Sequence, residues 1–500
     1  MGHTLKTFLL FIAAFIEGFI LLFLEISTPV AVAPVFGQNL HVWSSMLGIT
    51  LLSLMLGYFA AAYIMRHLNN WQKLFPYLFL WLSVYQTVIY FIVSKNQYFL
   101  NLNYYTGLFL YISLVIVPPV VLCGLTNTML ITLADEIFQN AGRAAAWILG
   151  ISTFGGILSS LMVAFVFLPQ YGLLNTLIFM AMISLIPSIF MLKPKYRIIP
   201  WILICSYTLF FVNYREIKPD KTTKTNVIFK KYTPFGEILV ADFPFYTESE
   251  WIPARGLFLN RIGQSLLNLN SQKPVWPYVN FTVNFLDSIF PNKDSVKILI
   301  SGLGAGTLPY ELQQKKFQIS VIENEPILYE VMQKFFYASK IPVIFQDFRY
   351  FLNKNNQKFD VIILDHFCGE NPPNHLYSLE FFNSIMNSLD ENGWCILNFF
   401  GYYEGKFGEA SRCIFHTINK ISTNFRVYLS GSTQDQGNLL FFIRHQKNMT
   451  PWPPINLKII TPDRFNKQNA FVIRDFYTGF QNASIYPSVT WRLAWQNSLK

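Results

Sequence analysis

The sequence has few charged residues in its first 213 positions and few cysteines anywhere. Only 12 of its 66 charged side chains lie in residues 1–213, although that part is about two fifths of the chain. No two of the five cysteines share a Cys-x-x-Cys spacing, and two of them lie within apolar runs. The sequence therefore indicates neither a disulfide framework nor a metal site. It favours reducing surroundings for the second part of the chain.

No long block of like charge is present either. Residues 214–500 hold 30 Lys/Arg and 24 Asp/Glu, a net charge of +6 that is widely spread. The densest basic stretch, residues 218–231, follows the last apolar run. Anionic lipid headgroups beside that run explain the basic stretch more simply than nucleic acid does. We therefore expect a lipid bilayer as a partner and no nucleic acid.

Long apolar runs fill the first part of the chain. They lie at residues 8–34, 43–65, 76–94, 107–132, 144–168, 171–192 and 198–213. Six are long enough to cross about 30 Å of hydrocarbon as helices, and the seventh is short and begins around Pro200. The first run is too long for a signal-peptide core and is interpreted as a retained span. The sequence thus predicts an α-helical transmembrane bundle of six to seven spans.

The loops between these runs differ in basic residues. The N-terminus and alternate loops carry seven of the eight: Lys6, Arg66, Lys73, Arg143, Lys193, Lys195 and Arg197. The other loops carry only Lys95, so the N-terminus is predicted to be cytoplasmic. Seven crossings would place residues 214–500 outside the cell, whereas six keep them inside with their basic stretch. We expect a multi-pass protein of the cell inner membrane with a cytoplasmic soluble domain.

Two carboxylates interrupt the first apolar run, Glu17 and Glu25. An ionisable group at membrane depth is costly and is a candidate functional residue. The alternative is a polar side chain buried against neighbouring helices, and the balance favours Glu25 over Glu17 as the functional acid. Residues 150–160 (GISTFGGILSS) are small enough to predict close packing between helices.

Residues 296–326 have the layout of a nucleotide-binding βαβ unit. Gly302, Gly304 and Gly306 follow a short apolar run and precede an amphipathic segment, and a second apolar run ends on Glu323. Glycines permit positive φ and a close approach of the backbone to a ligand. Glu323 can accept hydrogen bonds from both ribose hydroxyls. We predict a nucleoside-type ligand here; the alternative is a tight turn that binds nothing.

A small β cap is predicted before this unit, and an alternating α/β pattern after it. The cap has strands within residues 226–242 and at 255–261, followed by Gln264. Later strands are expected at 343–345, 358–364 and 393–399, and helices at 325–338 and 379–389. Alternating strands and helices imply a doubly wound, Rossmann-like sheet with right-handed crossovers.

Four segments follow from these patterns. We predict a multi-span transmembrane domain at 1–213, a basic linker and β cap with a connecting helix at 214–290, a Rossmann-like domain at 291–445 and a C-terminal extension at 446–500. Within the third segment Glu323, Asp347 and Asp365 each follow or end a predicted strand. Ligands of such sheets lie outside the carboxyl ends of the strands. One acid there could be a helix cap or a solvated strand end, but three beside a glycine turn predict a binding site.

At this point the chain resembles the spermidine-synthase branch of the class I methyltransferase fold. More closely, it is similar to bacterial proteins that fuse a multi-span membrane domain to a spermidine-synthase-like domain. The shared motifs are GRAAAWILGISTFGGILSSLMVAFVFLPQYG at 142–172, ILISGLGAGTL, VIENEP, QDFRYFL, FDVIILDHF and LYSLEFF. The resemblance implies a polyamine aminopropyltransferase. Such an enzyme transfers an aminopropyl group from decarboxylated S-adenosylmethionine to an amine such as putrescine, with no metal.

The resemblance also implies roles for individual residues. The turn from Gly302 to Gly306 would hold the adenosyl group, Glu323 the ribose hydroxyls and Asp347 the adenine amino group. Asp365 would be the catalytic acid that faces the amine. Gln264 would lie near both donor and acceptor.

The acceptor side departs from the family pattern. The family has a second acid where Cys368 stands, with Glu370 as a candidate replacement, and an aspartate where Asn260 stands. Two alternatives therefore stay open. One is a methyltransferase-like enzyme that uses S-adenosylmethionine on another acceptor, and the other is a non-catalytic transporter or sensor with a nucleoside-binding domain. The sequence indicates no oligomeric state.

Overall fold

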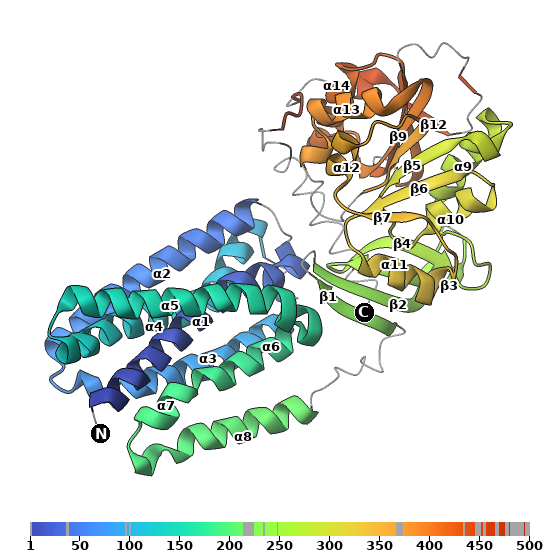
Figure 1. Cartoon of the computed structure of the whole chain (residues 1–500). Coiled ribbons are helices and arrows are strands. Elements are labelled where there is room, and N and C mark those ends of the chain that lie inside the picture. The colour runs from blue at the N-terminus through green and yellow to red at the C-terminus, as the bar shows by residue number, and fades with distance from the viewer. Residues whose placement is uncertain are drawn as a thin grey trace. The chain divides into compact units, whose positions relative to one another are not determined.

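The protein consists of a helical unit followed by an α/β unit (Figure 1). The computed structural model describes residues 3–36, 40–95, 98–99, 102–213, 225–233, 236–247, 249–366, 374–433, 436–445, 452–453, 457–465, 470–475, 480 and 495. The helical unit includes all helices up to residue 213. The α/β unit includes residues 225–230 and residue 237 onward.

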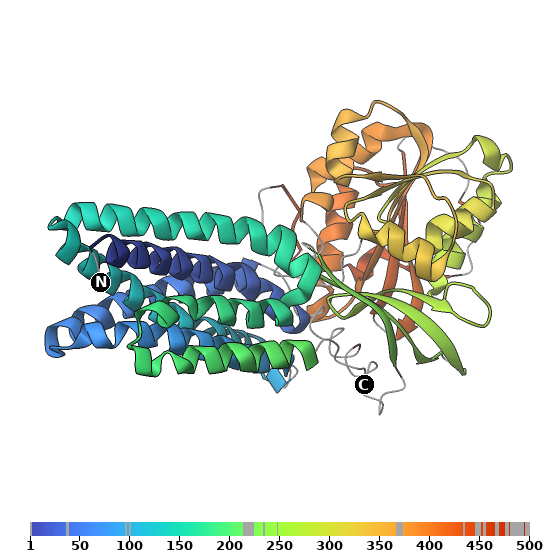
Figure 2. The ribbon, with the colours of Figure 1, turned by 60° about the horizontal axis from the view of Figure 1, so that its bottom comes forward.

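Long helices that pack side by side form the first unit (Figure 2). They are α1 (His3–Phe36), α2 (Leu40–His67), α3 (Phe75–Ser94), α4 (Tyr104–Phe138), α5 (Ala141–Met162), α6 (Leu168–Ser184), α7 (Ile186–Met191) and α8 (Ile198–Asn213). A π-helical stretch, Val163–Phe167, connects α5 to α6, and Gly172 inside α6 leaves the helical dihedral region with a φ of 71°.

Five helical stretches of the described chain are long and apolar enough to cross a membrane. They are Thr4–Ala33, His41–His67, Phe75–Ser94, Tyr104–Phe138 and Ala141–Met191. The last contains 51 residues and includes two of the predicted runs. Helix α8 has 16 residues and is not among the five, in line with its shorter apolar run. The total of six to seven spans stays a prediction.

Glycines set the close contact between α1 and α5. A Cβ atom at Gly18 would lie 1.9 Å from the carbonyl oxygen of Ser152, and one at Gly155 would lie 2.2 Å from that of Phe15. Both distances are far below van der Waals contact, so the two backbones approach this closely only because these positions lack side chains. The close packing predicted for residues 150–160 is confirmed at Gly155.

Glu17, and not Glu25, is the acid enclosed by neighbouring helices. Glu17 is 1% exposed, and its Oε2 accepts hydrogen bonds from Asn127 Nδ2 of α4 at 3.0 Å and from Ser152 Oγ of α5 at 2.7 Å. Glu25 is only partly buried. Glu17 thus matches the alternative of a polar side chain buried against neighbouring helices. A functional role for Glu25 stays a prediction.

A four-stranded sheet begins the second unit. Its strands are β1 (Asn226–Thr233), β2 (Gly236–Tyr246), β3 (Trp251–Leu259) and β4 (Ile262–Asn268), in that spatial order. The predicted β cap is confirmed, with β4 as an additional strand that contains Gln264. Helix α9 (Pro277–Ile289) leads from this sheet to the larger one.

The larger sheet has eight strands in the order β12-β10-β11-β9-β8-β5-β6-β7. They are β5 (Lys297–Ser301), β6 (Gln318–Glu323), β7 (Val343–Phe345), β8 (Phe359–Leu364), β9 (Leu389–Tyr402), β10 (Phe425–Thr433), β11 (Gln436–Arg444) and β12 (Lys458–Ile460). Neighbours from β9 to β7 are parallel, and β9, β11, β10 and β12 pair antiparallel. The Rossmann-like prediction is confirmed for this unit, with an antiparallel edge.

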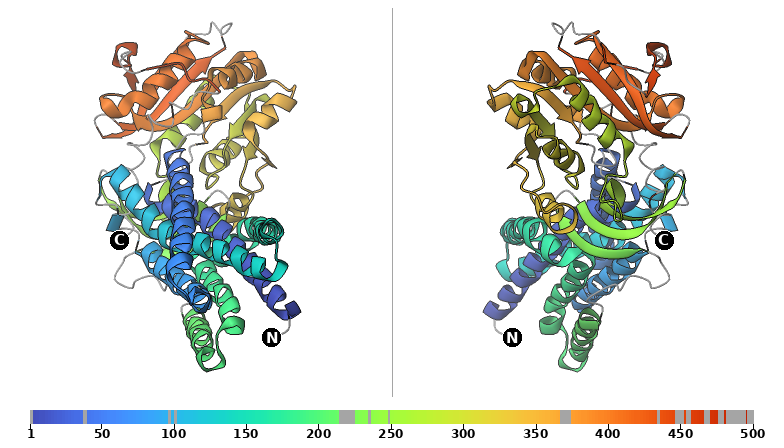
Figure 3. Two further views of the ribbon diagram at one scale, coloured as in Figure 1. Left: turned by 90° about the vertical axis from the view of Figure 1, so that its left-hand side faces the viewer. Right: turned by 90° about the vertical axis from the view of Figure 1, so that its right-hand side faces the viewer.

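Helices cover both faces of this sheet (Figure 3). They are α10 (Thr307–Gln314), α11 (Ile327–Val331), α12 (Phe348–Lys354), α13 (Leu379–Ser388) and α14 (Glu409–Asn419), together with α9. Along β8, Val361 and Ile363 pack on the side of α9 and α10, whereas Ile362 and Leu364 pack on the side of α12 to α14. Because both faces are covered, β8 is a continuous apolar run and does not alternate with polar residues.

The middle of the sheet contains the switch in strand order. Strand β5 pairs with β6 on one side and with β8 on the other, so the chain leaves β5 in one direction and later returns on its opposite side. The loops after β5 and β8 therefore diverge at their carboxyl ends. A ligand crevice is expected at such a point.

Candidate active site

The glycine turn after β5 adopts a backbone that requires glycine. The φ angles of Gly302, Gly304 and Gly306 are 95°, 55° and 76°. A Cβ atom at Gly302 would lie 2.4 Å from the carbonyl oxygen of Asp365, so the turn approaches the end of β8 closely. Side chains other than glycine are strained at these angles. The turn thus lies next to the carboxyl end of β8, and the amides of Gly302, Leu303, Ala305 and Gly306 within it donate hydrogen bonds to other groups of the protein.

Glu323, the last residue of β6, is bonded to this turn. Its Oε2 accepts a hydrogen bond from the Leu303 amide and its Oε1 accepts one from the Glu325 amide, each at 2.8 Å. The residue is 9% exposed, and burial raises the pKa of its carboxyl although the backbone amides oppose that shift. A carboxylate oxygen can accept more than one hydrogen bond, so both oxygens can also receive a hydroxyl.

Asp365 follows β8 and is held from both sides. Its Oδ2 accepts a hydrogen bond from the Tyr278 hydroxyl at 2.9 Å, and its Oδ1 accepts one from Asn398 Nδ2 at 2.8 Å. Asn398 is oriented in turn by Asn438, whose Nδ2 donates to Asn398 Oδ1 at 2.9 Å. These contacts fix the plane of the carboxylate.

Burial shifts the pKa values of both Asp365 and Tyr278. It raises the pKa of Asp365 above the usual carboxyl range, while the hydrogen bonds from Asn398 and Tyr278 oppose the shift. Burial and the adjacent Asp365 raise the pKa of Tyr278 well above its usual value, so the phenol stays a donor. A buried carboxylate whose two described donors, Tyr278 and Asn398, are neutral can attract a cation and accept a proton.

The sequence interpretation missed Tyr278, Asn398 and Ser265. Asn398 could have been found, because it is a polar residue inside the apolar strand segment WCILNF. Tyr278 lies in the first turn of α9 and carries no comparable signal. Ser265 Oγ accepts a hydrogen bond from the Ala305 amide at 3.2 Å and thereby connects β4 to the glycine turn.

Gln264 lies in β4, and its side chain bonds to its own strand. Its Nε2 donates to the Ile262 carbonyl of its own strand at 3.2 Å, and among the described residues it is the adjacent Ser265 that contacts the turn. Successive residues of a strand point to opposite faces, which separates Gln264 from its neighbour. A role for Gln264 beside donor and acceptor stays a prediction.

Asp347 also follows the carboxyl end of a strand, β7, and its carboxylate already has partners within the protein. Its Oδ1 accepts a hydrogen bond from the Tyr350 amide at 2.9 Å and so caps α12, while its Oδ2 lies 3.4 Å from His375 Nε2. The Asp347 side chain is 42% exposed, so it remains accessible to a ligand. Asp347 can therefore cap α12 through one oxygen and bind a ligand through the other.

The acceptor side is described only in part. Cys368 and Glu370 lie outside the described residues. Asn260 has a positive φ of 48° in the turn between β3 and β4, and its Oδ1 accepts a hydrogen bond from the Glu237 amide at 3.0 Å. Asn260 thus stabilises a turn. Within the described part of the chain, no group of three or more His, Cys, Asp or Glu side chains could hold a metal ion.

Comparisons with known proteins give similarities over part or most of the chain. Residues 297–401 match the spermine/spermidine synthase domain. Polyamine aminopropyltransferase 2 of Aquifex aeolicus (strain VF5) is 26% identical over 400 residues, which cover 76% of this chain and 76% of that protein. The polyamine aminopropyltransferase of Vibrio vulnificus (strain CMCP6) is 30% identical over 171 residues, which cover 33% of this chain and 54% of that protein.

Solved structures of spermidine synthases also align with the chain. The spermidine synthase of Thermotoga maritima aligns at 19% identity with a TM-score of 0.36, covering 52% of this chain and 84% of that chain.

The resemblance drawn from the sequence is confirmed by the domain match and the two relatives. The chain is a spermidine-synthase-like protein with an N-terminal helical region. The aligned stretch shared with the Aquifex aeolicus protein is longer than residues 214–500, so the similarity extends into the helical unit.

Proposed function

We propose that this protein transfers an aminopropyl group from decarboxylated S-adenosylmethionine to an amine such as putrescine. The observation that carries the proposal is the buried Asp365, oriented by Tyr278 and Asn398 next to the glycine turn. The spermine/spermidine synthase domain match supports it. In this reading the turn and Glu323 hold the nucleoside of the donor, and Asp347 receives its adenine amino group.

The proposed reaction forms a C–N bond and breaks a C–S bond. The amine nitrogen attacks the propyl carbon next to the sulfonium, and the bonding electrons leave with sulfur as the neutral thioether of 5′-methylthioadenosine. The sulfonium is already a good leaving group, so the protein mainly has to align nitrogen and carbon. An alkylammonium with a pKa near about 10 has no lone pair, so it must first lose a proton. Asp365 accepts that proton and attracts the cation beforehand.

A second candidate is a transferase that uses S-adenosylmethionine on another acceptor. The observation that favours it is Asn260, whose side chain is neutral and is used in a turn, so it supplies no charge for the far end of a diamine. The third candidate, a non-catalytic transporter or sensor, stays a prediction from the sequence. Turnover by the full chain would exclude it.

A calorimetric titration of the full chain with both donors separates the first two candidates. We expect decarboxylated S-adenosylmethionine to bind at least about tenfold more tightly, a difference of about 1.4 kcal/mol. The carboxylate that S-adenosylmethionine carries in addition would lie near the ionised Asp365 and be repelled by it. A clear preference for S-adenosylmethionine would remove the aminopropyltransferase proposal.

We also infer that the protein is a multi-pass protein of the cell inner membrane with its α/β unit in the cytoplasm. The five apolar helices and the basic loops support this inference. A fluorescent protein fused after Lys500 should be fluorescent, and alkaline phosphatase fused there should be inactive, because the phosphatase matures only outside the cytoplasm. Active phosphatase in intact cells would contradict the six-span topology.

A further inference from the structure

A short segment of the predicted C-terminal extension packs onto the Rossmann-like domain. Within residues 470–475, the Ile473 carbonyl accepts a hydrogen bond from the Leu379 amide at 2.8 Å, and the Ile473 amide donates to Thr417 Oγ1 at 2.9 Å. Ile473 is completely buried. The segment is therefore part of the fold of this unit, between α13 and α14.

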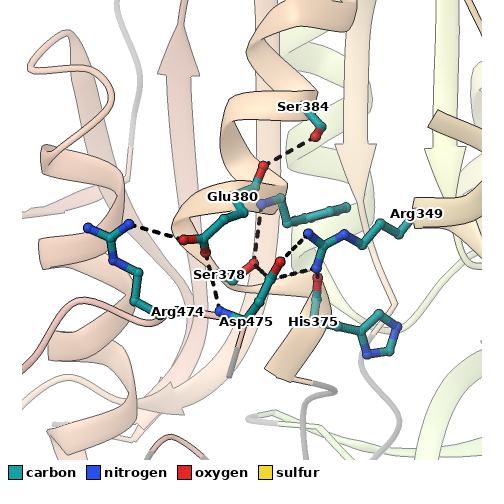
Figure 4. A network of polar contacts seen from close by, with 8 residues as sticks. Arg349, His375, Ser378, Glu380, Ser384, Arg474 and Asp475 are labelled. Carbon is teal, nitrogen blue, oxygen red and sulfur yellow. Dashed lines mark hydrogen bonds and ion pairs between the residues drawn. The ribbon is translucent and has the colours of Figure 1, made fainter. Parts of the chain in front are cut away.

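Asp475 at the end of this segment forms a bidentate ion pair with Arg349 of α12 (Figure 4). Arg349 Nη1 donates to Asp475 Oδ1 at 2.6 Å, and Nη2 donates to Oδ2 at 2.5 Å. The Ser378 hydroxyl, which caps α13, also donates to Asp475 Oδ1. Both charged side chains are about four-fifths buried, so this pair is shielded from solvent more than a surface pair is.

The same arginine extends the contact to the candidate donor site. Arg349 Nη1 also donates to the His375 carbonyl at 2.9 Å. The ring of His375 lies against Asp347, the acid expected to receive the adenine amino group, with 3.4 Å between Nε2 and Oδ2. Arg349 is itself only two residues beyond Asp347. Asp475, Arg349, His375 and Asp347 therefore form one connected chain of contacts.

The pKa values keep this connection charged at neutral pH. The Arg349 guanidinium lowers the pKa of Asp475, and burial opposes that shift only in part. The Asp475 carboxylate in turn raises the pKa of Arg349. Loss of the carboxylate charge would remove the ion pair and one of its two hydrogen bonds, so Arg349 would be held by neutral oxygens only among the contacts described.

We propose that Asp475 is a positioning residue for the donor site: through Arg349 it holds His375 against Asp347 and so fixes the adenine side. This inference rests on the proposed function, because it gives Asp347 the adenine-binding role. It assigns to residues 470–475 a part in donor affinity, although they lie far along the chain from the glycine turn and from Asp365.

The test compares Asp475→Asn with Arg474→Gln in the full chain. Arg474 is the matched control, because its Nη1 holds the same segment to Glu380 at 3.0 Å but does not contact Arg349 or His375. We expect Asp475→Asn to weaken binding of 5′-methylthioadenosine by about tenfold, which is a typical size for the coupling between two separate sites of a protein. It should raise the KM for the donor and leave kcat within about twofold, because Tyr278 and Asn398 hold Asp365 independently.

Hydrogen exchange without ligand is the second readout. Amides of residues 374–381 should exchange faster in Asp475→Asn and at the wild-type rate in Arg474→Gln. Unchanged nucleoside affinity in Asp475→Asn, or equal losses in both variants, would overturn the positioning role and leave the proposed function intact. A wild-type chain that binds no 5′-methylthioadenosine would instead overturn the proposed function and the inference with it, whatever the exchange rates show.

Discussion

Asp365→Asn is expected to lower kcat for amine alkylation by about 10²- to 10⁴-fold, the range for loss of a general base. Asparagine has nearly the shape of aspartate and can keep both hydrogen-bond partners, since its oxygen can accept from Asn398 and its amide can donate to the Tyr278 hydroxyl. It cannot accept the ammonium proton. Steady-state kinetics of the full chain with donor and amine would measure the loss.

Two controls make this variant informative. Affinity for the neutral product 5′-methylthioadenosine should stay within about threefold of wild type, because the carboxyl group contacts neither Glu323 nor the turn amides among the contacts described, and threefold is below 1 kcal/mol. The variant should also unfold at an equal or higher temperature at pH 7. Burial raises the folded-state pKa of Asp365, so its contribution to stability is full below the unfolded pKa and is lost as pH rises through the folded pKa. Substantial turnover by Asp365→Asn would show that another group is the base.

The same pKa shift predicts the acid limb of wild-type activity. Only the ionised form of Asp365 can accept a proton, and its raised pKa means that ionisation is completed at a higher pH than for an exposed aspartate. A profile of log(kcat/KM) against pH should therefore show activity falling on the acid side. The midpoint of that fall should lie at a higher pH than the pKa of an exposed aspartate.

Glu323→Gln is expected to lower donor affinity by about 10- to 100-fold. A hydrogen bond to a charged acceptor contributes about 1.5–3 kcal/mol, and the carboxylate is expected to receive the ribose hydroxyls. The substitution also has a local cost, because the two carboxylate oxygens accept from the Leu303 and Glu325 amides, and an amide NH₂ would oppose one of those donors. Calorimetry with 5′-methylthioadenosine and the full chain would measure the change.

Glu330→Gln on α11 is the control for this prediction. Glu330 is exposed and lies one helical turn beyond the rim, so its charge is removed without a change at the glycine turn. The Glu330→Gln variant should bind 5′-methylthioadenosine with the same affinity as wild type. Equal affinity of Glu323→Gln and wild type would mean that Glu323 only stabilises the turn. The Glu323 and Glu330 variants test nucleoside binding, whereas Asp365→Asn tests the proton transfer.

The fold of the α/β unit was largely predictable because its strands are short apolar runs that end in a glycine or an acid. Strands β7 and β8 lie within one residue of the predicted positions, and β5 and β6 are the two apolar runs expected on either side of the amphipathic segment. Because these strands pair in parallel, Gly302, Glu323, Asp347 and Asp365 all lie at the carboxyl ends of the sheet's strands. This grouping could be predicted without any long-range contact being known. Local patterns thus suffice where a sheet is parallel and its ligand groups follow the strand ends.

The partners of these residues could not be predicted in the same way. Tyr278 reaches Asp365 across 87 positions of sequence and Asn398 across 33. Such contacts depend on how α9 and β9 pack against β8, which no local pattern records. Asp475 is a still clearer case, since it meets Arg349 across 126 positions from a segment without regular structure. The enclosed Glu17 likewise depends on which helices surround α1.

The most direct test of the central claim is product analysis with the full chain, decarboxylated S-adenosylmethionine and putrescine. Mass spectrometry should detect 5′-methylthioadenosine and an amine that has gained one aminopropyl group, in equal amounts and only when both substrates are present. The account would be contradicted if decarboxylated S-adenosylmethionine stayed intact, or if S-adenosylmethionine instead yielded S-adenosylhomocysteine and a methylated acceptor.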